Sequence, residues 1–232
     1  MRYSKALCLA LCVVMAAMLA PAAPASAARL CEENSAKCKA GKFYKTGEAL
    51  EAKLVGGKFA VFRAGKFNES GVFELAFEVA CNESVINAKT TNEGGGTGTP
   101  VLSEVTGATF GWMGGANCPA TGGLNNCTVT SLGRPYQGSI EFTAGTNGLW
   151  SIVEKGGGGQ PRVELSCLGK TVVCFYGKNI LEVSIVGGMT WLPTVNQKLE
   201  KGAGSAGACP AVAFYLAEYE GVKPGKMWIA DE

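Results

Sequence analysis

Histidine is absent from this sequence, and Asp231, next to the C-terminus, is the only aspartate. Without histidine, neither Ser-His-Asp nor Cys-His catalysis is available, and a zinc site loses its commonest nitrogen ligand. A single aspartate excludes an aspartic-protease dyad and argues against EF-hand calcium sites. We therefore expect no enzyme, no metal site and no cofactor.

Glutamates keep one enzymatic alternative open. A glycosidase needs two carboxyl groups facing a glycosidic bond, and glutamates occur on several expected strands. Each of them also fits the solvent-facing phase of its strand, so an exposed sheet face explains them equally well. These residues are Glu74, Glu78, Glu141, Glu164 and Glu182.

Long apolar runs are absent except at the N-terminus. Arg2 and Lys5 precede an apolar run over 6–20, which ends in two prolines and the triplet Ala25-Ser26-Ala27. The run is shorter than the roughly 20 residues of a spanning helix. The order of these features predicts a signal peptide over 1–27, cleaved after Ala27. We expect a secreted, extracellular protein, either free or associated with the cell wall, with no membrane span after cleavage.

A basic excess is also missing. The sequence has 21 basic and 19 acidic residues, and the signal peptide removes two basic ones, which leaves 19 of each. This balance argues against nucleic-acid binding, which uses a basic surface to neutralise phosphates. The segment 37–67 nevertheless carries a local charge of +6 from eight basic and two acidic residues.

Two interpretations of that basic segment remain open. Lysines can protect exposed strand edges against aggregation, or they can contact an anionic polymer of the cell envelope. The eight residues are Lys37, Lys39, Lys42, Lys45, Lys53, Lys58, Arg63 and Lys66.

Eight cysteines follow the signal peptide, and an even number in an exported chain indicates four disulfides. None of their spacings is C-x₂-C, so a structural zinc site is not indicated. Short separations favour a local pairing, and the two remaining cysteines would then form the fourth bond. The hypothesis is Cys31–Cys38, Cys118–Cys127, Cys167–Cys174 and Cys81–Cys209.

Alternation of apolar and polar residues is the dominant pattern. It predicts strands over 73–79, 136–142, 180–186 and 212–220, with further strands near 49–54, 58–62, 84–90, 101–112, 127–131, 148–154, 163–168, 172–176 and 194–200. Glycine pairs between these segments supply the positive φ of tight hairpins, and no helical periodicity appears after residue 27.

The pattern predicts an all-β protein: a glycine-rich, disulfide-stabilised antiparallel β-sandwich, immunoglobulin-like or related, with about 10–13 short strands. We expect one domain over 28–232, although a boundary near 92–100 would divide it into two small β domains.

Short cysteine-containing motifs recur in a characteristic order along the chain. Their order resembles a group of exported, cysteine-containing, β-rich proteins of high-GC soil actinobacteria whose function is unassigned. The resemblance implies export, a β-rich fold and disulfides, and it supplies no catalytic residues. The motifs are Cys31 to Cys38 followed by Phe43-Tyr44-Lys45-Thr46-Gly47, then Val79-Ala80-Cys81-Asn82-Glu83-Ser84, Cys118 to Cys127, Arg134-Pro135-Tyr136, Val163-Glu164-Leu165-Ser166-Cys167, Cys174-Phe175-Tyr176, Val186-Gly187-Gly188 and Cys209-Pro210.

These features favour a non-enzymatic secreted or envelope-associated protein with a structural or interaction role. Its partner is unknown, a cell-wall polymer or another envelope protein being the two candidates. The alternative is a carbohydrate- or envelope-polymer-binding module that uses the basic segment and exposed tryptophans. Core packing explains the same tryptophans, which are Trp112, Trp150, Trp191 and Trp228. A glutamate-dependent polysaccharide hydrolase is the third reading.

Overall fold

The computed structural model describes residues 27–96, 98–156 and 159–232. All but the last residue of the expected signal peptide therefore lie outside the described residues. The described chain contains strands and turns but no helix, as the alternating pattern predicts. It accordingly holds no helix long and apolar enough to cross a membrane.

The described residues form sixteen strands, more than the 10–13 expected. They are β1 (Arg29–Cys31), β2 (Ala49–Leu54), β3 (Ala60–Phe67), β4 (Phe73–Cys81), β5 (Glu83–Thr90), β6 (Val101–Gly111), β7 (Asn117–Pro119), β8 (Asn126–Leu132), β9 (Tyr136–Phe142), β10 (Gly148–Val153), β11 (Arg162–Cys167), β12 (Val172–Gly177), β13 (Ile180–Val186), β14 (Leu192–Lys201), β15 (Val212–Lys223) and β16 (Trp228–Ala230). Every strand expected from the alternation is present.

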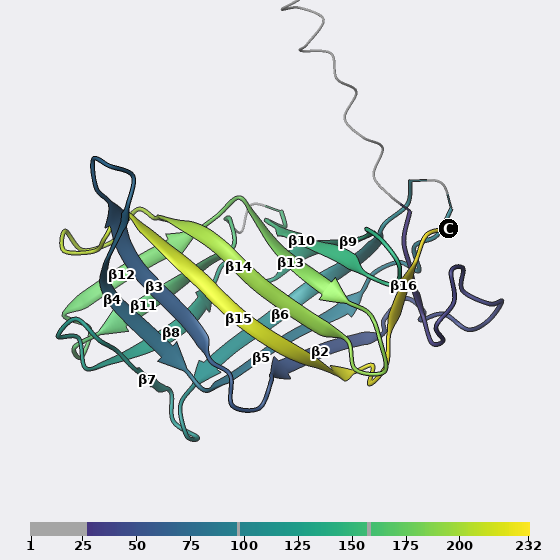
Figure 1. Ribbon diagram of the computed structural model, residues 1–232, viewed down its shortest axis with the longest axis horizontal. Coiled ribbons are helices and arrows are strands. Elements are labelled where there is room, and N and C mark those ends of the chain that lie inside the picture. The colour runs from purple at the N-terminus through teal and green to yellow at the C-terminus, as the bar shows by residue number, and fades with distance from the viewer. Residues whose placement is uncertain (1–26, 97, 157–158) are drawn as a thin grey trace, which may run out of the picture.

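Eight of these strands form a closed antiparallel barrel, in the order β15-β2-β5-β6-β9-β10-β13-β14 (Figure 1). The barrel closes because β14 pairs with β15 over seven residues, from Thr194 opposite Glu218 to Glu200 opposite Val212. The predicted β-sandwich is therefore wrong in its architecture, although the antiparallel all-β class is confirmed. Closure leaves these eight strands without a free edge over the paired lengths.

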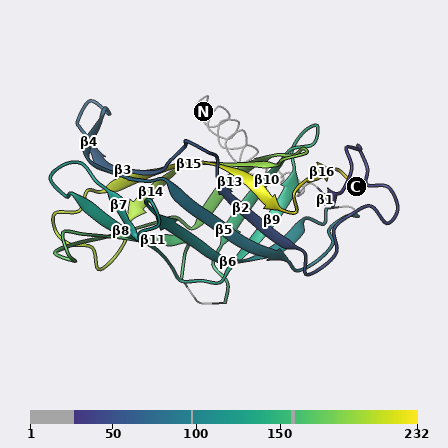
Figure 2. The same cartoon turned by 90° about the horizontal axis from the view of Figure 1, so that it is seen from below.

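Six of the other strands extend the sheet from β15 and β14, whereas β1 and β16 form a separate two-stranded sheet. β3 and β4 continue from β15, and β12, β11, β8 and β7 continue from β14. The two arms meet again at one bridge between Val79 and Ala120 and at the Cys81–Cys118 disulfide. We call this second circuit, which shares β14 and β15 with the barrel, the second ring. Its strands β7, β8 and β11 lie at the end of the molecule opposite β16 and the C-terminus in both views (Figures 1 and 2).

Side chains fill the barrel. Trp150 is 1% exposed, and its Nε1 donates a hydrogen bond to Ser103 Oγ at 3.0 Å. A Cβ at Gly138 would collide with both partners, so only glycine fits there. Eight strands enclose an interior that side chains can fill, so this barrel is a packed core.

A chain of three hydroxyl groups crosses the same interior. Tyr215 and Tyr219 are 2.5 Å apart at their hydroxyl oxygens, and Tyr219 lies 2.9 Å from Ser84 Oγ. Burial raises the pKa of both tyrosines, most strongly that of Tyr215, because their charged forms would be desolvated. Both hydroxyls are thus held neutral and satisfied inside the core.

The four disulfides include only one of the expected pairs. Cys31–Cys38 is confirmed, whereas the other bonds are Cys81–Cys118, Cys127–Cys167 and Cys174–Cys209. The local pairing is wrong because strand register decides which side chains meet. Cys174 lies opposite Leu165 on β11, two residues away from Cys167.

Cys127 lies on β8, which pairs with β7 on one side and β11 on the other. It has two cysteine neighbours, Cys118 opposite it on β7 and Cys167 opposite it on β11. The bond forms on the β11 side, and Cys118 bonds instead to Cys81 on β4. All four cysteines are completely buried. The inward face of this part of the second ring is therefore a row of disulfide-bonded sulfurs.

Candidate functional site

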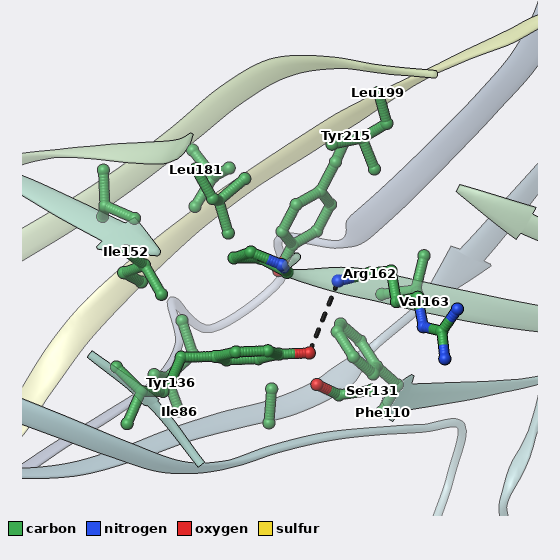
Figure 3. Close-up of a pocket in the computed structure, with 15 residues that line it drawn as sticks. Ile86, Phe110, Ser131, Tyr136, Ile152, Arg162, Val163, Leu181, Leu199 and Tyr215 are labelled. Carbon is green, nitrogen blue, oxygen red and sulfur yellow. Dashed lines mark hydrogen bonds between the residues drawn. The ribbon is translucent and has the colours of Figure 1, made fainter. Parts of the chain in front are cut away.

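An apolar cavity lies where the barrel meets β8 and β11 (Figure 3). Phe110, Leu181 and Tyr215 are among the side chains that surround it, and its volume is about 60 Å³. At one side the Arg162 backbone N–H donates a hydrogen bond to the Tyr136 hydroxyl at 3.4 Å. Ligand pockets usually measure about 300–1,000 Å³. This cavity is therefore a packing gap between the barrel and strands β8 and β11 rather than a binding pocket.

A polar hollow lies outside the barrel, where β14 leaves β13 and joins β12. Its charged side chains form ion pairs with one another, since Lys178 Nζ is 3.7 Å from Glu182 and Lys198 Nζ is 2.9 Å from Glu200. Lys178 also donates a hydrogen bond to Gln197 at 2.5 Å. A ligand would have to displace these pairs, so the hollow is a poor binding site.

A second polar hollow lies on the outer face of the second ring, and we call it the amide cleft. Its floor is the row Asn117, Thr128 and Ser166, and its walls are the turns 124–126 and 168–170. The hollow measures about 460 Å³. That volume falls within the range of about 300–1,000 Å³ that is usual for ligand pockets.

Strand register builds the floor of the amide cleft. Asn117 lies opposite Thr128, and Thr128 lies opposite Ser166, so three polar side chains from β7, β8 and β11 stand side by side. Thr128 Oγ1 donates a hydrogen bond to Asn117 Oδ1 at 2.9 Å. The Ser166 hydroxyl oxygen is buried and has no hydrogen-bond partner among the described residues. Buried polar atoms are normally paired, and this atom is one of two buried side-chain polar atoms without a partner among the described residues.

The disulfide row lies directly behind this floor. Successive residues of a strand point to opposite faces, and each floor residue is next to a cysteine that points inward. Asn117 precedes Cys118, Thr128 follows Cys127, and Ser166 precedes Cys167. The bonds Cys81–Cys118 and Cys127–Cys167 therefore fix the strands that carry the floor, which is what a preorganised site requires.

The walls of the cleft contain left-handed backbone at residues other than glycine. Asn125 has φ of 58°, Leu168 has 51° and Lys170 has 76°. Such conformations cost on the order of 1–2 kcal/mol for L-residues other than glycine or asparagine. Thr171 stabilises the second turn, because its Oγ1 donates a hydrogen bond to the Leu168 carbonyl at 2.9 Å. The turn thereby holds the Leu168 side chain 40% exposed at the rim.

The expected anionic-polymer residues do not form one open basic surface. Six of the eight lie within 4.0 Å of a glutamate oxygen, and Lys37 and Lys42 are in the loop between β1 and β2. The six pairs are Lys39–Glu33, Lys45–Glu93, Lys53–Glu220, Lys58–Glu218, Arg63–Glu78 and Lys66–Glu74.

Ion pairs also account for part of the glutamate set that kept the hydrolase interpretation open. Glu74, Glu78 and Glu182 each pair with a basic residue on a sheet surface. Glu104 lies beside Lys155 and Lys89, whose hydrogen bonds hold its pKa below the ordinary value. A catalytic acid needs a raised pKa, so this carboxyl is tuned in the opposite direction.

Three of the four tryptophans are in the core. Trp150, Trp191 and Trp228 are at most 8% exposed, and Trp112 stacks on Phe59 with ring centroids 5.7 Å apart. They therefore do not form the exposed stacking surface that the carbohydrate-binding alternative invoked. In the described part of the chain, no three acidic, cysteine or histidine side chains gather as a metal-binding group.

The sequence analysis missed the amide cleft. The local signal was there, since three strands carry an asparagine, threonine or serine immediately beside a cysteine of the opposite phase. What the sequence does not reveal is that these three strands are neighbours. Comparison with protein families, curated proteins and solved structures finds no match to this chain, so the function is argued from this geometry.

Proposed function

We propose that the protein is exported and acts by binding, without catalysis, as a component of the extracellular space or the cell envelope. The amide cleft is its binding surface. Four disulfides support the oxidising environment, because such bonds persist outside the cytoplasm. The N-terminal charge, apolar run and small-residue triplet support export through a signal peptide.

One observation carries the proposal: the polar floor of the cleft is backed by two disulfides while the Ser166 hydroxyl in that floor lacks a partner. A folded protein gains stability by pairing or removing a buried hydroxyl. Retaining an unpaired one in a rigid, outward-facing hollow is consistent with a partner that arrives from outside.

The cleft is equipped for binding rather than for covalent chemistry. Its side chains are amides, hydroxyls, two leucines and Lys170, with no carboxylate among the residues that line it. A serine nucleophile needs a base within hydrogen-bond reach. The Ser166 oxygen makes no hydrogen bond to Lys170, so this pair is not arranged for proton transfer.

The test is sedimentation of the purified mature protein with washed cell envelopes of the producing organism at physiological salt. We expect saturable depletion of the protein from solution and no release of soluble sugar or peptide fragments. A Lys178→Gln variant serves as the control, since that lysine lies in the self-paired hollow and should not affect binding. Release of fragments in proportion to protein, or no depletion at any concentration, would overturn the proposal.

A further inference from the structure

We infer that the amide cleft binds a short segment of an acidic sugar chain, with the carboxylate of a uronic acid residue at Lys170 and sugar hydroxyls along the floor. The inference rests on the proposed function and names the ligand class of the same cleft. It follows from three properties of the lining: the type of polar group, the apolar rim and the single charge.

The polar groups match a polyhydroxylated ligand. An asparagine amide offers two donors and one acceptor, and a serine hydroxyl both donates and accepts. Sugar hydroxyls likewise donate and accept, so each can pair with an amide or with the free Ser166 oxygen. Asn117 on β7 and Asn126 on β8 line the same hollow as Ser166 on β11, which places several such groups on one face of the sheet.

The rim supplies apolar contact beside those polar groups. Leu168 is 40% exposed and is held outward by its left-handed backbone. Leu124, in the opposite wall, is buried in the core, so Leu168 supplies the apolar contact. The C–H face of a pyranose ring is apolar, so a ring between the two turns can bury that face while its hydroxyls reach the floor. A simple polyol or a lone inorganic anion would not use the rim.

The charge selects an acidic sugar. Among the described residues, Lys170 is the only charged one that lines the cleft, whereas the lysines of the hollow between β12 and β14 are paired with Glu182 and Glu200. A lysine next to neutral amides favours one carboxylate per binding segment. A densely charged polyanion would find no further cation within the lining.

The experiment titrates the intact mature protein with a β-1,4-linked glucan tetrasaccharide in which one residue is glucuronic acid and, in parallel, with its neutral counterpart cellotetraose. Calorimetry measures affinity, and amide chemical shifts locate the contact. We expect the acidic oligomer to bind more tightly by about tenfold at low salt, with shifts centred on 117–128 and 166–170. Lys170→Gln should abolish that preference, and the matched control Lys178→Gln should retain it.

A second variant separates a binding role for Ser166 from a purely structural one. Ser166→Val removes the unpaired hydroxyl and keeps a residue suited to a strand. We expect its melting temperature to rise while its affinity for the acidic oligomer falls about tenfold. A rise in melting temperature with unchanged affinity would show that the hydroxyl does not contact sugar and would overturn the inference.

The remaining outcomes are also decisive. Absence of binding by both oligomers, shifts centred on another surface, or equal affinities that ignore Lys170→Gln would overturn the inference. Failure of the ligand class is distinguishable from failure of the proposed function. If the protein still sediments with cell envelopes but ignores both oligomers, binding stands and the acidic sugar is wrong.

Discussion

Cys127 and Cys167 lie directly opposite each other on β8 and β11, and their disulfide crosses the same two strands that present Thr128 and Ser166 on the outer face. One covalent bond on the inner surface thus sets the spacing of two polar side chains on the outer surface. The relationship makes the disulfide a support of the cleft as well as of the fold.

Replacing this disulfide should affect stability and binding together. We expect Cys127→Ala with Cys167→Ala to lower the free energy of unfolding by roughly 2–4 kcal/mol and to weaken sugar binding, because the floor loses its support. Urea denaturation and calorimetric titration would measure the two effects. Cys31→Ala with Cys38→Ala is the matched control, since that bond joins residues only seven apart and lies far from the cleft. Equal loss of binding in both variants would contradict the supporting role.

Gly138 should not tolerate a side chain. Its Cα faces the Trp150 indole and the Ser103 hydroxyl, so Gly138→Ala must displace one of them inside the barrel. Overpacking of this kind costs about 1–3 kcal/mol. Gly207→Ala is the control, since no atom lies within 4 Å of its added Cβ, and its effect should stay within about 0.5 kcal/mol. Thermal melting of both variants tests the prediction, and indistinguishable melting temperatures would refute it.

Stability should fall in alkali because buried tyrosines are held neutral. Burial raises the pKa of Tyr44 to about 12 and raises the pKa values of Tyr176, Tyr215 and Tyr219. The unfolded chain loses these protons near pH 10, before the folded chain does, so the unfolded state then binds fewer protons. The stabilisation is complete below pH 10 and declines as pH rises further.

Denaturation midpoints from pH 8 to 11.5, with tyrosinate absorbance, would follow this loss. We expect Tyr215→Phe to flatten the alkaline decline, because one strongly shifted group is removed. An unchanged decline in that variant would show that another group governs alkaline unfolding.

The basic segment should bind polyanions weakly. Six of its eight cations are already paired with glutamates, which leaves Lys37 and Lys42 as the expected contributors. The salt dependence of binding to a linear polyanion should therefore reflect about two released counterions rather than eight. Lys37→Gln with Lys42→Gln should nearly remove that dependence. A slope near eight would revive the basic segment as a polymer-binding surface.

Local pattern was sufficient to locate the strands. In β13, for example, alternation identifies Val183 and Ile185 as inward-facing, and that information is contained within a few consecutive residues. In β4 the alternation holds only from Phe77 onward, since Leu75 is 45% exposed. The closure of the barrel was not predictable in this way. Closure requires β14 to pair with β15 while β15 also pairs with β2 and β3. Alternation does not identify which strands are neighbours.

The disulfide pairing and the amide cleft could not be predicted from the sequence, and the reason is the same for both. Cys31 and Cys38 pair within a loop, where closeness in sequence decides the partner. Cys127 instead has cysteines on both flanking strands, so the partner depends on which pair of inward-facing side chains forms the bond. Asn117 and Ser166 reach the same floor only because β7, β8 and β11 are adjacent. Strand order, rather than residue type, was the missing information.

The hairpin of β14 and β15 has a consequence for the order in which the molecule is assembled. It occupies residues 192–223, which are synthesised after all the other strands of the barrel and the second ring, and both circuits close through it. Strands β2 and β3 therefore pair with β15 only after more than a hundred further residues have been synthesised. Such long-range pairing makes folding slow and leaves both circuits of the nascent chain open until β15 has been synthesised. If the protein is exported as we propose, this late closure keeps the chain unfolded enough to pass through a translocation pore and to close its two circuits afterwards.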